Sequence, residues 1–152
     1  MRIWILLLLI GLLFGCSGKG TSPGKAALVV DFQNSTVIKK CVEFQENSTA
    51  LDLLKSAGLS IETKDDPAFG PGLCGIEGVG CSSSKCFCDS KKYWGFYYDS
   101  ESGNWSYSNV GAGSLFDGNR TIVRDRAVVG FRWGEFGQLP ENARFEDICL
   151  PG

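Results

Sequence analysis

The chain has 152 residues, with 15 Lys and Arg against 17 Asp and Glu and a formal net charge of −2, and it contains no histidine. A nearly balanced charge without basic clusters argues against nucleic acid as a partner. The lack of histidine removes the commonest metal ligand and excludes Ser-His and Cys-His nucleophilic pairs. The length fits one small domain rather than two.

The N-terminal segment predicts export. Its apolar run from Ile3 to Phe14 is shorter than the roughly 20 residues that a membrane-spanning helix needs, and it is typical of a secretory signal. The ending Leu-Phe-Gly-Cys16 resembles a lipobox, so we expect a lipoprotein signal peptide over 1–15, lipidation at Cys16 and a flexible tether over 16–25. The alternative is an ordinary signal peptide with an incidental cysteine.

The domain that we expect over 26–152 begins with a hairpin and a helix. Two β-rich runs, 26–33 and 36–45, flank a short Asn-Ser linker and predict a β-hairpin. The pattern changes to a helical period over 48–58, where Leu51 and Leu54 share a face. Ser48 or Thr49 is a suitable N-cap, and Gly58 is suited to follow the last turn.

The rest of the domain reads mainly as strands and loops. We expect a short strand at 59–64, a loop at 65–72, a glycine-bent strand at 73–81, a cysteine-stapled loop at 82–92, strands at 93–98 and 105–108, a loop at 111–119, two β-rich runs in 120–134 broken near 124–126, and an irregular tail tied down by Cys149. This order predicts an α+β class: a small, mixed, disulfide-stapled sheet with one packed helix, similar to a β-grasp.

The cysteine count favours disulfides. With Cys16 set aside for lipid, an even number remains in an exported domain, which predicts three bridges of unknown pairing. The alternative is a metal site in Cys-Ser-Ser-Ser-Lys-Cys-Phe-Cys, but its spacing differs from common zinc modules and no histidine completes it. We therefore expect no metal. The cysteines concerned are Cys41, Cys74, Cys81, Cys86, Cys88 and Cys149.

Four Asn-x-Ser/Thr sequences are acceptors for N-glycosylation if the host modifies exported proteins. The alternative is chance occurrence in a polar, turn-rich surface, and in either case the asparagines should be exposed. They are Asn34, Asn47, Asn104 and Asn119.

No constellation of catalytic residues is visible. The neighbouring carboxylates Asp65 and Asp66 lie in a Pro/Gly loop, which they are expected to solvate. A Gly-rich stretch over 70–80 lacks the Lys-Ser/Thr ending of a phosphate loop. We therefore expect a binding protein rather than an enzyme.

The aromatic residues between 93 and 107 are too many for one face of a sheet. Strand alternation places Trp94, Phe96 and Tyr98 on one face and Tyr93 and Tyr97 on the other. One helix can cover only one of these faces. The other is either shielded by the cysteine loop and the tail, or it forms a shelf of rings for a ligand or a partner protein. The residues that we single out for binding are Tyr93, Trp94, Tyr97, Trp105, Tyr107, Arg132 and Trp133.

Three stretches resemble the transcobalamin C-terminal-like domain family. They are the Leu-rich helix STALDLLKSAGLSI, the aromatic stretch YWGFYYDSESGNWSYSNVGAG and the closing strand VVGFRWG. The clusters CVEF, CGIEGVGC…CFC and F-x-D-I-C resemble an exported prokaryotic subgroup more closely. The resemblance covers roughly residues 26–149.

The resemblance implies a β-grasp-like fold and cobalamin or another corrinoid as ligand. In animal transcobalamins a related domain closes over the upper face of cobalamin, while a helical barrel supplies the other half of the site. Because this chain has neither that barrel nor a histidine for cobalt, the resemblance implies a partial, weak or partner-completed site.

The sequence thus predicts a non-catalytic, lipid-anchored binding protein on the outer face of the cytoplasmic membrane. One hypothesis is corrinoid capture, with hand-over to a membrane transporter. The other is a surface interaction or adhesion module that binds protein or glycan.

Overall fold

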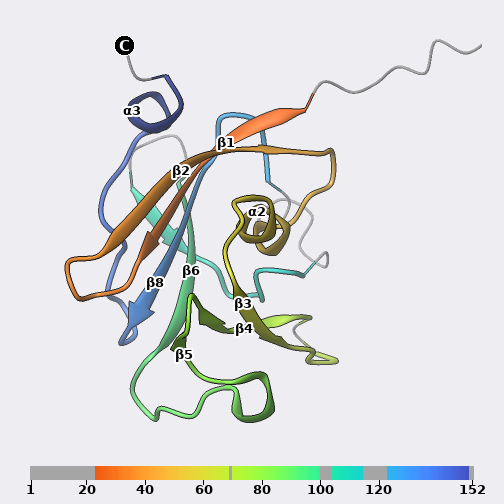
Figure 1. Ribbon diagram of the computed structural model, residues 1–152, viewed down its shortest axis with the longest axis vertical. Helices are drawn as coiled ribbons and strands as arrows, with labels where there is room; N and C mark the ends of the chain where they lie inside the picture. Colours follow the sequence, from red (N-terminus) through yellow and green to blue (C-terminus); the bar gives the residue numbers. More distant parts are fainter. Residues whose placement is uncertain (1–22, 69, 100–103, 115–122, 151–152) are drawn as a thin grey trace, which may run out of the picture.

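A five-stranded mixed sheet forms the centre of the computed structural model, which describes residues 23–68, 70–99, 104–114 and 123–150 (Figure 1). The signal-peptide and lipidation predictions, Asn119 and most of the tether lie outside these residues. The strand order is β2-β1-β8-β6-β7. The bounds are β1 Gly24–Asp31, β2 Val37–Phe44, β6 Tyr93–Asp99, β7 Trp105–Tyr107 and β8 Val128–Gly134.

The pairing makes the sheet mixed. Strand β1 pairs antiparallel with β2 and parallel with β8, and β6 is antiparallel to both β8 and β7. The predicted N-terminal hairpin is therefore confirmed, with its strands shifted by one or two residues. Of the two β-rich runs expected in 120–134, the second forms β8 and the expected break is a turn at residues 124–127, whereas most of the first run lies outside the described residues.

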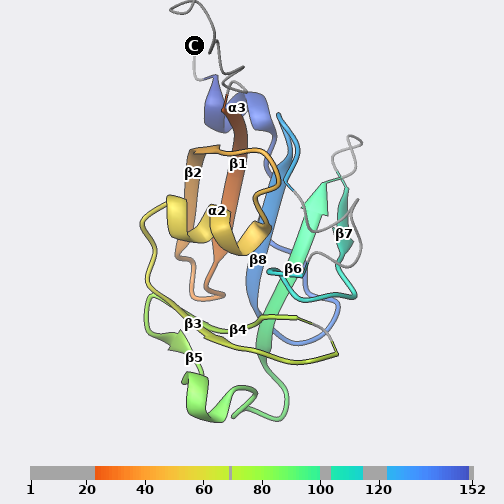
Figure 2. The same ribbon diagram turned by 90° about the vertical axis from the view of Figure 1, so that its right-hand side faces the viewer.

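One helix, α2 (Ala50–Ser56), packs across one face of this sheet (Figure 2). Thr49 and Asp52 form a capping box, in which each side chain accepts from the other residue's backbone N–H. Gly58 follows the last turn with φ +74°, a conformation that costs glycine little. The buried leucines of the helix, Leu51, Leu53 and Leu54, join the main hydrophobic core. The predicted α+β class with one packed helix is confirmed.

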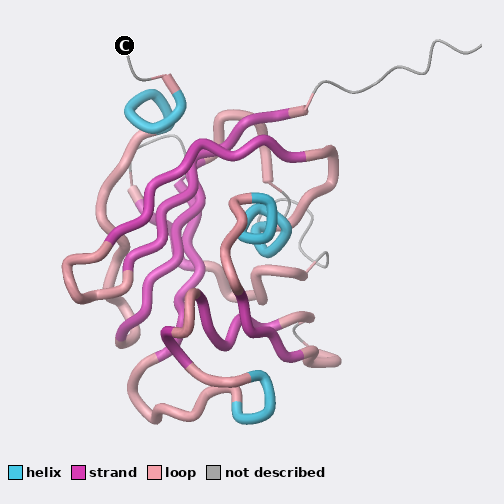
Figure 3. Tube along the Cα trace, viewed as in Figure 1, coloured by secondary structure: helices cyan, strands magenta, loops and turns pink. Residues whose placement is uncertain are grey.

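A second, three-stranded sheet lies beside the first, visible as a separate group of strands in Figure 3. It consists of β3 (Ile61–Lys64), β4 (Gly72–Ile76) and β5 (Val79–Gly80), all antiparallel. The predicted single glycine-bent strand over 73–81 is thus two strands, because Glu77 and Gly78 both adopt positive φ and turn the chain back. Leu73 and Ile76 of β4 are part of the main core.

Three disulfides staple the molecule, which fixes the pairing that the sequence left open. Cys74–Cys86 and Cys81–Cys88 hold the loop with the short 3-10 helix η1 (Ser83–Lys85) against β4 and β5. Cys41–Cys149 joins β2 to the C-terminal helix α3 (Phe145–Cys149). The cysteines of the alternative metal site are therefore all in disulfides.

The tail is more regular than the sequence suggests. Phe145 is buried, and α3 packs on β1 and β2 on the side of the sheet opposite α2 (Figure 1). A helix of this length shows almost no periodic pattern, so the sequence predicts an irregular tail here. Asp147 and Glu146 stand in its first turn, where acidic groups complement the helix dipole. Within the described residues, no helix has the length and apolar character needed to cross a membrane.

We expect the Cys41–Cys149 bridge to be the most stabilising of the three. Its partners are 108 residues apart, against 7 for Cys81–Cys88. In the chain-entropy model a loop of about 100 residues contributes about 4.7 kcal/mol and a loop of about 15 residues about 3 kcal/mol. In urea unfolding, Cys41→Ser/Cys149→Ser should therefore lower the free energy of unfolding more than Cys81→Ser/Cys88→Ser does. The reverse order would show that loop closure does not dominate.

Candidate functional site

The aromatic residues of β6 are divided between the two faces of the main sheet, as alternation predicts. Trp94 and Phe96 belong to the core under α2. Phe96 stacks on Phe131 at a centroid distance of 5.4 Å, and Trp94 meets Phe32 edge-on at 5.4 Å. These contacts fix one aromatic set by packing on neighbouring strands and leave the other set on the opposite face.

The opposite face is covered by the tail. Tyr97 is only 2% exposed, and its hydroxyl donates to the carbonyl of Gln138 at 2.7 Å. Trp105 lies so close over Gly130, beside Pro140, that a Cβ at Gly130 would come within 2.7 Å of the indole. The shielding alternative therefore holds for these two rings. The cover comes from the tail, whereas the cysteine loop contributes to the cavity described below.

A partly buried ion pair between β8 and β1 provides an attachment point for the tail. The Arg132 guanidinium donates to the Asp31 carboxylate, which also accepts from the backbone N–H of Glu141 at 3.1 Å and of Gln33 at 2.9 Å. Removing one member of such a pair leaves the other charge buried and uncompensated. Arg132 is one of the predicted binding residues, but its guanidinium is paired with the carboxylate that holds the tail.

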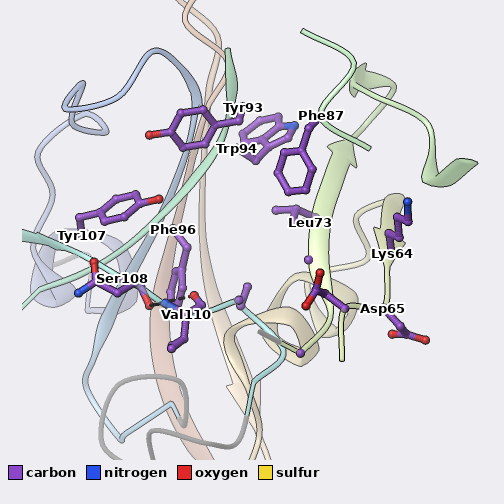
Figure 4. A pocket seen from close by; sticks show the side chains of 16 residues that line it. Lys64, Asp65, Leu73, Phe87, Tyr93, Trp94, Phe96, Tyr107, Ser108 and Val110 are labelled. Atoms are coloured by element: carbon purple, nitrogen blue, oxygen red, sulfur yellow. Dashed lines mark hydrogen bonds between the residues drawn. The ribbon is translucent and has the colours of Figure 1, made fainter. Parts of the chain in front are cut away.

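A cavity of about 410 Å³ opens between the start of β6 and the second sheet (Figure 4). It exists because β7 ends at Tyr107, opposite Tyr97, so the first residues of β6 extend past their neighbouring strand. The remaining walls come from β3, β4, the cysteine loop and the segment 108–112. Its aromatic lining consists of Phe87, Tyr93, Trp94, Phe96 and Tyr107.

Polar groups occur at restricted places on the cavity wall. Lys64, Asp65 and Asp66 line it from the end of β3 and the loop that follows. Ser108 directly follows β7 and lines the opposite wall, and its backbone N–H donates to the Phe96 carbonyl at 2.9 Å. Apolar and aromatic walls with a few placed polar groups are typical of sites for small organic ligands.

Two phenols near the cavity, those of Tyr93 and Tyr97, have raised pKa values. Burial raises the pKa of Tyr93 far above its ordinary value, and the neighbouring Tyr107 adds to this by charge repulsion and a hydrogen bond. Burial also raises the pKa of Tyr97, again with Tyr107 as a contributor. The Tyr93 hydroxyl points to the side of Tyr107, with which it shares a hydrogen bond, and as a neutral phenol it can both donate and accept (Figure 4).

The structure brings only part of the predicted binding set to the cavity, namely Tyr93, Trp94 and Tyr107. Trp133 is half-buried and packs against the main core, with its ring 5.8 Å from Trp94. Of the predicted glycan acceptors, Asn34, Asn47 and Asn104 are exposed.

Sequence reasoning missed Phe87, Leu73 and Lys64, and it assigned Asp65 only to solvating its loop. The Cys-Phe-Cys sequence contains a usable signal, since a large apolar residue between two bridged cysteines cannot easily fold inward.

Comparison with known proteins relates the chain to one fold. No family model matches the sequence, and no curated protein matches it. Among solved structures, the fold is similar to that in a crystal structure of haptocorrin in complex with Cbi, with a TM-score of 0.53 and 19% identity. The match covers 75% of this chain and 25% of that chain, so this chain corresponds to about a quarter of the haptocorrin structure. At this identity the similarity establishes the fold alone.

The raised pKa values of Tyr93 and Tyr97 predict a loss of stability at high pH. Above pH about 10 the unfolded chain releases these phenolic protons while the folded chain keeps them, so unfolding becomes more favourable as pH rises. The stabilisation that comes from keeping these two phenols protonated is fully present below pH about 10. We expect Tyr93→Phe to reduce the fall in unfolding free energy between pH 9 and 11, measured by urea titration. An unchanged pH dependence would contradict the raised pKa of Tyr93.

Proposed function

We propose that this protein binds a corrinoid without catalysis, and that the aromatic cavity beside Trp94 receives one edge or face of the ligand. The observation that carries the proposal is the position of the cavity, which lies in a fold similar to that of a haptocorrin crystallised with Cbi. Distant membership in the transcobalamin-like family is part of this proposal, as is the domain assignment to 26–152.

The chemistry of the cavity suits such a ligand. A corrinoid combines a flat conjugated ring with amide-bearing side chains around its rim. The rings of Trp94, Tyr93 and Phe87 supply broad apolar contact area, and aromatic side chains gain most where flat surfaces meet. Lys64, Asp65 and the neutral Tyr93 hydroxyl supply charged and neutral hydrogen-bonding groups for the amides.

The size of the cavity supports partial enclosure. A volume of about 410 Å³ falls within the roughly 300–1,000 Å³ of sites that bury drug-sized ligands. A complete corrinoid is larger than such ligands, so much of it would extend into solvent or against a partner. We therefore propose modest affinity for the chain alone, and hand-over of the ligand to a membrane transporter.

The proposed location is the outer face of the cytoplasmic membrane. It rests on the signal-like N-terminal run and on Cys16, whose two acyl chains would give stable anchoring where one would not. The three disulfides are consistent with an oxidising compartment.

A second candidate function is an interaction or adhesion module that binds protein. The observation that favours it is an exposed apolar patch on the tail side. Phe136 is 76% exposed and contacts Tyr107 edge-on at 5.5 Å, and Leu139 is also exposed nearby in sequence. Large exposed aromatic groups in contact with one another are common at protein interfaces.

Titration with cobinamide tests the corrinoid proposal. We expect heat in calorimetry and a shift in the visible absorption of the ligand, with a dissociation constant of about 1 mM or tighter. Tyr93→Ala should weaken binding about tenfold, because it removes an aromatic wall and a hydroxyl. The matched control is Tyr98→Ala, a half-buried tyrosine of the same strand that does not line the cavity.

Two outcomes would contradict the proposal. One is the absence of both heat and spectral shift at about 1 mM cobinamide, a threshold of about −4 kcal/mol. The other is equal weakening by the two tyrosine variants, which would place binding elsewhere on β6.

The lipid anchor has an independent test. In a bacterial host, Cys16→Ser should move the protein from the membrane fraction to the soluble exported fraction, because the acylated thiol is lost. Mass spectrometry of the wild-type N-terminal peptide should show a diacylglyceryl group. Unmodified Cys16 in a membrane-free protein would support an ordinary signal peptide.

A further inference from the structure

Phe87 is an exposed aromatic residue in an unusual backbone position. It lies between Cys86 and Cys88 and is 69% exposed. Its φ is +62°, which bulky L-residues rarely adopt. Leaving a phenylalanine in water forfeits the free energy of burying its ring, and the backbone conformation adds a further cost. The surrounding structure must therefore impose both features.

The two neighbouring disulfides impose them. Cys86 is bridged to Cys74 in β4, and Cys88 is bridged to Cys81 directly after β5. The backbone on each side of Phe87 is thus covalently attached to the second sheet. The ring cannot retreat into the core by a rearrangement of its loop, because both flanking residues are fixed.

The fixed ring faces the cavity. In Figure 4 Phe87 is drawn beside the indole of Trp94 and above Leu73, and all three line the same cavity. Trp94 is itself held in place, since its Nε1 donates to the Val79 carbonyl at 3.0 Å and its ring packs edge-on against Phe32. Two aromatic groups, one from the cysteine loop and one from β6, therefore border one opening.

We propose that Phe87 is a ligand-binding residue of this cavity: its ring covers the flat conjugated part of a bound ligand, and the two flanking disulfides hold its backbone in position. The proposal rests on the proposed corrinoid function and identifies the ligand-covering residue. A backbone segment that two disulfides already hold in place loses little freedom when a ligand binds, so more of the contact energy of Phe87 appears as affinity. This gives a reason for two disulfides around so short a loop.

The first test compares side chains at position 87, with cobinamide as the probe. Phe87→Ala should weaken binding at least tenfold with an unchanged unfolding midpoint, because an exposed ring contributes little to stability. Phe87→Tyr should bind within about twofold of the wild type, because it keeps the flat ring. Lys85→Ala is the control, since Lys85 lies in the same loop, is exposed and does not line the cavity.

The second test frees the ring without removing it. Cys81→Ser/Cys88→Ser should weaken cobinamide binding nearly as much as Phe87→Ala, and adding Phe87→Ala to it should cause little further loss. Cys41→Ser/Cys149→Ser is the matched control, because it removes a disulfide at α3, away from the cavity, and should leave the affinity unchanged. Each variant is measured at a temperature where circular dichroism shows it folded.

The outcomes separate the inference from the function on which it rests. Wild-type binding that Phe87→Ala leaves unchanged overturns the role of Phe87 and leaves the corrinoid proposal standing. Weakening by Phe87→Ala but not by Cys81→Ser/Cys88→Ser overturns the role of the disulfides. No binding of cobinamide by the wild-type protein overturns the corrinoid function, and this inference with it.

Discussion

The fold depends on covering both faces of its central sheet. Strand β1 lies in the interior of that sheet and is apolar on both sides, and β8 beside it adds Val129 and Phe131 to one face and Val128 to the other, so neither face can be left in water. A single helix covers one side. The other is covered by the tail, which the Arg132–Asp31 pair, the Tyr97 hydroxyl and the Cys41–Cys149 bridge each hold at a different point. The tail packs on aromatic residues, Tyr97 and Trp105, that seemed too numerous for one face in the sequence.

The cavity follows from a mismatch at the edge of the same sheet. Strand β7 is too short to accompany β6 along its length, and the second sheet packs against the core without pairing with the first. The start of β6 is consequently flanked by side chains and loops instead of a continuous strand. Rings from both faces of β6, Tyr93 and Trp94, reach this one opening, which a division of residues into two faces does not anticipate.

Sequence reasoning succeeded where the physics is local. Capping at Thr49, the turn at Gly58 and the alternation of Trp94 with Tyr97 depend on residues close together in the chain. It failed where partners are distant. The disulfide partner of Cys41 is Cys149 in the tail, and the Asp31 carboxylate accepts from Glu141, which is more than 100 positions away in the chain. The place of Phe87 in the site is of the same kind, because it follows from two disulfide pairings that the sequence alone left among many alternatives.

The parallel pairing of β1 with β8 also orients the molecule. Strand β1 begins at Gly24, and its far end is level with Arg132 near the end of β8, which in turn pairs with the start of β6 at Tyr93. The entry of the chain and the aromatic opening therefore lie at opposite ends of the sheet, as Figure 2 shows for β1 and the loops near β5. A molecule that enters the opening therefore meets the sheet at the end away from Gly24, where β1 begins.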